Sequence, residues 1–140
     1  MPNGRETERL VAFGQSVYFL TTGIWPIAHI RSFEWVSGPK VDRWLVKTVA
    51  ALISIVGSAI GLAAWHRRLT TEIRLLAVGS ALALAIVDLI YVARGRIRWV
   101  YLLDALAELG LIGAWGWSRR VSGNNGRQSS RDTHSSNQRL

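Results

Sequence analysis

The chain has 140 residues, of which 49% are hydrophobic, and it carries a formal net charge of +8 and no cysteine. The lack of cysteine excludes disulfide bonds, thiolate metal sites and thiol redox chemistry. The basic residues lie at the ends of apolar blocks and in the C-terminal tail, which favours helix anchoring and contact with anionic lipid over nucleic-acid binding.

Four blocks of the sequence are almost free of charge. They cover residues 10–30, 44–65, 73–93 and 99–117. An α-helix needs about 20 apolar residues to cross the ~30 Å hydrocarbon core of a bilayer, whereas a helix of a soluble protein keeps a broad polar face. The sequence therefore predicts an all-α, multi-pass membrane protein with a four-helix transmembrane domain over residues 1–120.

The first block is predicted to stay in the mature protein as a transmembrane helix. It is longer than the apolar core of a signal peptide, and no small-x-small cleavage motif follows it. Pro26 is expected to kink or end this helix, because its ring disrupts a backbone hydrogen bond. His29 follows in the last turn, where we interpret it as an interfacial residue rather than a metal ligand.

The second block has small side chains along one face, which lets another helix backbone approach closely. We therefore predict a helix-packing surface here. Its residues are Ser54, Gly57, Ser58 and Gly61. Lys47 lies one turn inside the start of the block. Two interpretations stay open for it: extension toward the lipid headgroups, or pairing with a buried carboxylate.

The blocks are joined by short connections at residues 31–43, 66–72 and 94–98. Short connections favour antiparallel packing of sequence neighbours, so we predict an up-down four-helix bundle. Ten lysine and arginine residues fall on the side of the two termini and seven on the other side. The excess predicts that both termini are cytoplasmic, in the inner membrane if the protein is bacterial.

Residues 121–140 form a tail that is rich in serine, asparagine, glycine and arginine. Large apolar side chains are almost missing from it. Such a segment cannot bury enough surface to offset the entropy of its chain. We therefore predict a disordered basic tail.

Five ionisable side chains fall within or at the ends of the blocks, all at or toward one membrane face. They are His29, Lys47, Asp88, Asp104 and Glu108, and Tyr91 and Tyr101 lie at a similar depth. A charge at the centre of a membrane helix costs about 2.5–3.5 kcal/mol. We therefore expect the carboxyl groups to face one another, a base or water, and at least one of them to be protonated at neutral pH.

Two interpretations of the three acids, Asp88, Asp104 and Glu108, stay open. They form a site for a proton, a cation or the polar end of a ligand, or they form a satisfied network that fixes helix register or joins two protomers. We predict no metal or cofactor, because a Glu-x-x-His pair on one helix and other metal-binding spacings are missing. The sequence contains no recognised catalytic motif, so we assign no enzymatic activity.

Three runs, "SGPKVDRWLVKTV", "DLIYVARGRI" and "YLLDALAEL", are similar to small four-helix integral membrane proteins, mostly bacterial, that have no assigned function. The similarity extends from about Phe13 to Trp117. It implies a four-helix membrane fold and no particular activity. Small multidrug-resistance transporters are similar in size, but they place their key glutamate in the first helix, where this chain has Gln15.

Three functional hypotheses follow from the residues. The bundle binds a small amphipathic ligand through its acids, or it is an oligomeric proton-coupled carrier or conduit, or it is a non-catalytic subunit of a membrane complex. The one-sided position of the acids favours the first hypothesis, and four helices are few for a transport path in one monomer. The expected partners are the lipid bilayer, a small amphipathic ligand and, for a carrier, further copies of the chain.

Overall fold

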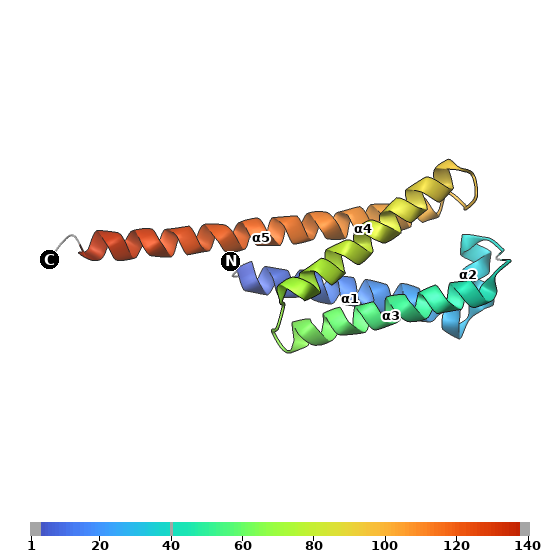
Figure 1. Ribbon diagram of the computed structural model, residues 1–140, viewed down its shortest axis with the longest axis horizontal. Helices are drawn as coiled ribbons and strands as arrows, with labels where there is room; N and C mark the ends of the chain where they lie inside the picture. The colour runs from blue at the N-terminus through green and yellow to red at the C-terminus, as the bar shows by residue number, and fades with distance from the viewer. Residues whose placement is uncertain (1–3, 40, 138–140) are drawn as a thin grey trace.

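The computed structural model describes residues 4–39 and 41–137, with side chains described as far as residue 120. This part of the chain is all-α, with five helices and no strand (Figure 1). The helices are α1 (Gly4–Ala28), α2 (Ile30–Ser37), α3 (Arg43–Trp65), α4 (Thr71–Ala93) and α5 (Tyr101–Asn137). The predicted all-α class is confirmed.

Within the described residues, three helices are long and apolar enough to cross a membrane, namely α1, α3 and α4. This finding is consistent with the prediction of a membrane protein. The fourth predicted span lies in α5, where Asp104 and Glu108 interrupt the apolar run. Large exposed side chains such as Ile55, Leu75 and Leu106 give α3, α4 and α5 apolar outer surfaces.

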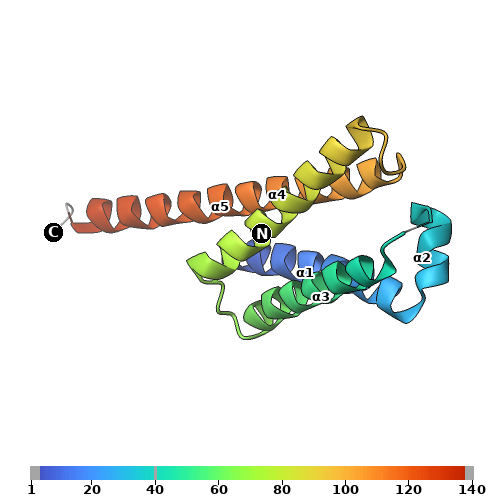
Figure 2. The ribbon, with the colours of Figure 1, turned by 45° about the vertical axis from the view of Figure 1, so that its right-hand side comes forward.

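The long helices alternate in direction, and α1 packs on two of the other long helices. Its main partners are α3 and α5, while α4 packs chiefly on α5 (Figures 1 and 2). The helices α3 and α4 make limited contact and diverge from the connection that joins them. The start of α1 therefore lies at the same end as the α3–α4 connection, and the α4–α5 connection lies at the opposite end.

Close packing of α1 on α3 depends on glycines. A Cβ atom at Gly57 of α3 would lie 2.8 Å from Cβ of Phe19, and one at Gly61 would collide with Oγ of Ser16. A Cβ atom at Gly23 of α1 would collide with the Ser54 hydroxyl. Small residues on both helices thus bring the two backbones together, and direct contact between helices is a main source of association in lipid.

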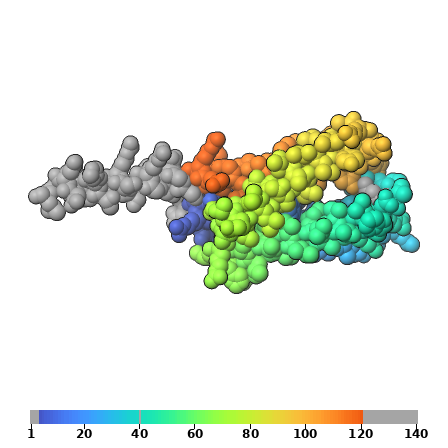
Figure 3. Space-filling model, in the orientation of Figure 1, coloured from blue at the N-terminus to red at the C-terminus, as the bar shows by residue number. Residues whose placement is uncertain are grey.

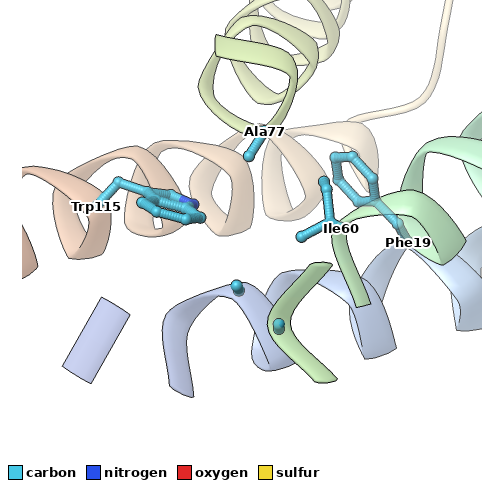
Figure 4. Packing of buried hydrophobic residues seen from close by; sticks show 6 residues of the cluster. Phe19, Ile60, Ala77 and Trp115 are labelled. Carbon is cyan, nitrogen blue, oxygen red and sulfur yellow. The ribbon is translucent and has the colours of Figure 1, made fainter. Parts of the chain in front are cut away.

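The buried core joins all four long helices. It contains Phe19 from α1, Ile60 from α3, Ala77 from α4 and Trp115 from α5, together with Ala12 and Ala64 (Figure 4). Alanines also occupy the inner face of α4, where Ala77, Ala81 and Ala85 are all buried. Their small side chains allow α4 to approach its neighbours closely.

Three features differ from the sequence-based expectation. Helix α1 begins at Gly4 rather than near residue 10, and the longest connection contains the short helix α2. His29 caps α2, because its Nδ1 atom accepts a hydrogen bond from the backbone N–H of Ser32 at 3.2 Å. Helix α5 continues to Asn137, although the side chains after Arg120 lie outside the described residues. The disorder of the tail stays a prediction.

Candidate functional site

Helical spacing places Asp104 and Glu108 on one face of α5, since residues four apart are neighbours on a helix surface. Asp88 lies near the end of α4, on the same face as its buried alanines. Tyr18 of α1 completes the arrangement, because its hydroxyl donates a hydrogen bond to Oδ1 of Asp104. We call these four residues, which come from three helices, the acid cluster.

The acid cluster is largely shielded from its surroundings. Glu108 is 1% exposed and Asp88 is 7% exposed, while Asp104 and Tyr18 are half-buried. The Oε2 atom of Glu108 has no hydrogen-bond partner among the described residues. An ionised carboxylate in such a position would lose its water without gaining a compensating hydrogen bond.

The acid cluster contains three carboxyl groups and a phenol, and no basic side chain. The charges of Asp88 and Asp104 both act on Glu108, and all three acids act on Tyr18. Three carboxyl groups this close cannot all be ionised without strong repulsion. The geometry thus gathers carboxyl groups around one hydroxyl and places the most buried carboxyl, Glu108, among them.

Two of the predicted site residues, both with basic side chains, lie outside the acid cluster. Lys47 is exposed near the start of α3, and His29 is exposed at the junction of α1 and α2. Both lie at the end of the molecule where α2 and the start of α3 are found. Their side chains do not point into the bundle, and pairing of Lys47 with a buried carboxylate has no support in the described contacts.

The predicted tyrosines are also less buried than the acids. Tyr91 is 44% exposed on α4, and Tyr101 is half-buried at the start of α5. The predicted helix-packing residues fall into two groups. Gly57, Gly61 and Ser54 lie at the contact between α1 and α3, whereas Ser58 is exposed and donates to the Ser54 carbonyl oxygen of its own helix at 2.8 Å.

Sequence reasoning did not identify a second buried polar group centred on Gln15. The side-chain amide of Gln15 donates to the Ala77 carbonyl oxygen at 2.8 Å, and the Trp115 indole N–H donates to Oε1 of Gln15 at 2.8 Å. Both side chains are at most 1% exposed. Because Gln15 and Tyr18 are three residues apart, α1 presents both to α5. The helical spacing of polar residues in the first block was the available signal.

Two cavities lie at opposite ends of the molecule, and neither is lined by a member of the acid cluster. One of about 400 Å³ lies at the start of α1 and the α3–α4 connection. The other, of about 500 Å³, lies between residues 37–39 and 95–98. Among the described residues, no group of three or more potential metal ligands is arranged to hold a metal ion.

The chain matches no protein-family model, no curated protein and no solved structure. The chemistry of the site is therefore argued from its own residues. A carboxyl group that is buried, close to two others and without a hydrogen-bond partner at Oε2 is suited to binding a proton or another small cation. Tyr18 supports this chemistry by donating to Asp104 and keeping its carboxyl group in place.

Proposed function

We propose that this chain is a multi-pass membrane protein whose acid cluster binds and releases a proton inside the membrane, as part of a proton-coupled carrier or conduit. The observation that supports the proposal most directly is the burial of Glu108, which is 1% exposed and has an Oε2 atom without a hydrogen-bond partner among the described residues. Acidic residues within membrane helices are costly, and they commonly belong to proton or ion pathways.

Comparison of Glu108 with the two other acids indicates which group would hold the proton. Tyr18 donates a hydrogen bond to Asp104 and so holds that carboxyl group in place. Asp88 is 7% exposed and Asp104 is half-buried, whereas Glu108 is 1% exposed and its Oε2 atom has no hydrogen-bond partner among the described residues, so a bound proton would remove an uncompensated buried charge there. Glu108 is therefore the group that we expect to hold the proton when the site is loaded.

The proposal includes a fourth span within α5, over residues 101–117, and both termini on the cytoplasmic side. Exposed leucines give this part of α5 an outer surface suited to lipid, while Asp104 and Glu108 lie on its inner side. These leucines are Leu102, Leu103, Leu106 and Leu109. Acids that face inward can be accommodated in a membrane helix when they contact other polar groups. Four spans offer little room for a path, so a carrier of this size would act as an oligomer.

Infrared spectroscopy of the full chain in lipid tests the protonation step. A neutral carboxyl group has a C=O stretching band that is distinct from the bands of a carboxylate. We expect this band at neutral pH in the wild type and its loss in Glu108→Gln. The matched control is Glu72→Gln, because Glu72 is an exposed acid in the first turn of α4. A wild-type spectrum without a band that depends on Glu108 would contradict the proposal.

Proton flux tests the transport step. Liposomes that contain the chain and a pH-sensitive dye should acidify when a membrane potential draws protons inward. We expect Glu108→Gln to abolish this acidification and Glu72→Gln to leave it unchanged. Equal flux in the wild type and Glu108→Gln would exclude a proton conduit that uses the acid cluster. A subunit with a purely structural role predicts that result.

The binding of a small amphipathic ligand with a basic group is a second candidate. The divergence of α3 and α4 supports it, since the space-filling view shows the two helices separating toward the end where α2 lies (Figure 3). A ligand that enters from the lipid between these helices would bring its cation toward Asp88. Native mass spectrometry of the purified chain should then detect a retained small molecule that Asp88→Ala releases. Repeatedly empty protein would exclude this candidate.

A further inference from the structure

A second polar site lies at the opposite end of the helices from the acid cluster. It is the cavity of about 400 Å³, which lies where α1 begins and α3 connects to α4. Its lining includes Leu69 and six charged residues. The charged residues are Arg5, Glu6, Glu8, Arg9, Arg67 and Arg74. Four arginines against two glutamates leave an excess of positive charge around one cavity.

The two glutamates already have partners and hold the arginines in place. Oε2 of Glu8, a residue that is 6% exposed, lies 2.7 Å from Nη2 of Arg74. Glu6 lies 3.5 Å from the Arg67 guanidinium and 3.9 Å from that of Arg9. These ion pairs connect the first turns of α1 with the α3–α4 connection and the start of α4. They also explain why α1 begins earlier than its apolar block.

The arginines keep hydrogen-bond donors that these pairs do not use. The Nε atom of Arg74 is buried and has no hydrogen-bond partner among the described residues. Arg9 uses its Nε to donate to the Ala64 carbonyl oxygen at 3.1 Å, while its Nη1 atom lies 3.9 Å from Oε2 of Glu6, beyond hydrogen-bond distance. A buried donor without an acceptor is unfavourable, so an acceptor on a bound ligand would stabilise this arrangement.

We propose that this cavity binds a phosphate-bearing anion. Guanidinium groups donate paired hydrogen bonds that match the oxygens of a phosphate, and several arginines around one cavity would offset its charge. The cavity lies at one end of α1, α3 and α4, three helices that can cross a membrane. A phospholipid headgroup and a free phosphate in solution share this chemistry. The site does not involve the acid cluster and does not depend on its proposed function.

Native mass spectrometry of the full chain in neutral detergent tests the proposal. The probes are phosphatidylglycerol, phosphatidylcholine with the same acyl chains, and inorganic phosphate. We expect the wild type to retain phosphatidylglycerol in preference to phosphatidylcholine. Arg5→Gln/Arg67→Gln should weaken this retention about 25-fold, since each basic residue near a membrane surface contributes about a fivefold gain in affinity for anionic lipid. Both arginines are exposed, so these substitutions should leave the fold intact.

The matched control is Arg119→Gln/Arg120→Gln. It removes two exposed arginines that lie outside the cavity lining. We expect it to retain phosphatidylglycerol as the wild type does. Equal losses in the two double variants would overturn the proposal, because they would indicate general attraction between basic protein and anionic lipid. A wild type that retains neither phosphatidylglycerol nor inorganic phosphate would overturn it as well.

Two further measurements sharpen the test. Arg74→Lys keeps a positive charge beside Glu8 and removes the buried Nε donor, so we expect weaker retention of the anion in a folded protein. Retention equal to that of the wild type would contradict the role of this donor. At constant ionic strength, a rise in melting temperature with inorganic phosphate would identify a free anion as a ligand. Retention of phosphatidylglycerol without such a rise would identify the lipid headgroup.

Discussion

The hydroxyl of Tyr18 donates a hydrogen bond to Oδ1 of Asp104, and this contact joins α1 to α5 across 86 positions of the sequence. Asp104 belongs to the group of three acids that the sequence singles out, whereas Tyr18 becomes part of the site only through folding. The pair thus connects the packing of α1 on α5 to the position of one carboxyl group of the acid cluster.

Replacing Tyr18 with phenylalanine should destabilise the protein without changing its core volume. Hydrogen bonds to charged groups contribute about 1.5–3 kcal/mol in water-soluble proteins, and side-chain hydrogen bonds in membrane bundles about 0.6 kcal/mol on average. We expect Tyr18→Phe to lower the free energy of unfolding in mixed micelles by about 1 kcal/mol. Tyr91→Phe is the control, since Tyr91 is exposed. Equal stability of Tyr18→Phe and the wild type would show that the contact contributes nothing.

Replacing Glu108 with glutamine should separate function from stability. The amide has the shape of a protonated carboxyl group and cannot ionise, so the fold should be as stable as the wild type, within about 1 kcal/mol. Proton flux in liposomes should be lost. Thermal unfolding in detergent measures the first expectation and acidification of the liposomes measures the second. A large loss of stability with unchanged flux would instead assign Glu108 to the structural network.

Adding a single methyl group should disrupt the contact between α1 and α3. Gly57→Ala places a Cβ atom 2.8 Å from Cβ of Phe19, which forces the helices apart. Overpacking of this kind costs about 1–3 kcal/mol. Gly79→Ala in α4 is the matched control, because nothing lies within 4 Å of its added Cβ atom, and alanine is the better helix former. The free energy of unfolding in mixed micelles should be lower than that of the wild type in Gly57→Ala and should not be lower in Gly79→Ala.

The buried pair of Gln15 and Trp115 should show strong coupling. Trp115→Phe removes the indole donor and leaves Oε1 of Gln15 without it, which should cost more than the lost volume alone. Gln15→Leu removes the acceptor and also the hydrogen bond to the Ala77 carbonyl. A double-mutant cycle on the free energy of unfolding should give a coupling of about 0.5–2 kcal/mol. Additive effects of the two substitutions would contradict this pairing.

Much of the helical framework can be predicted from the sequence. The bounds of α3 and α4 agree with the second and third apolar blocks within two residues, because hydropathy and length are local properties of the chain. The early start of α1 is not local. Its first turns are connected to residues of the α3–α4 connection and α4 through Glu6 and Glu8, and these contacts form only when the three helices pack together.

The acids of the candidate site were also predictable, since a carboxyl group within an apolar run is conspicuous and has to be accommodated inside the protein. The sequence places Lys47 and His29 at a similar depth, because depth follows from counting residues along a helix. It does not establish which way each side chain faces. That depends on how each helix is rotated by its packing, and α3 and α4 diverge toward the end where Lys47 lies.

The same distinction accounts for the partners of the acids. Hydropathy, block length and the cost of burying charge act along the chain, and they are sufficient to predict an all-α membrane protein with acids inside it. Tertiary packing decided the partners of these groups. It placed Tyr18 beside Asp104 and Gln15 beside Trp115. It left Oε2 of Glu108 without a partner among the described residues. Hydrogen bonds require atoms within about 3 Å of each other, and only the packed helices bring such distant residues that close.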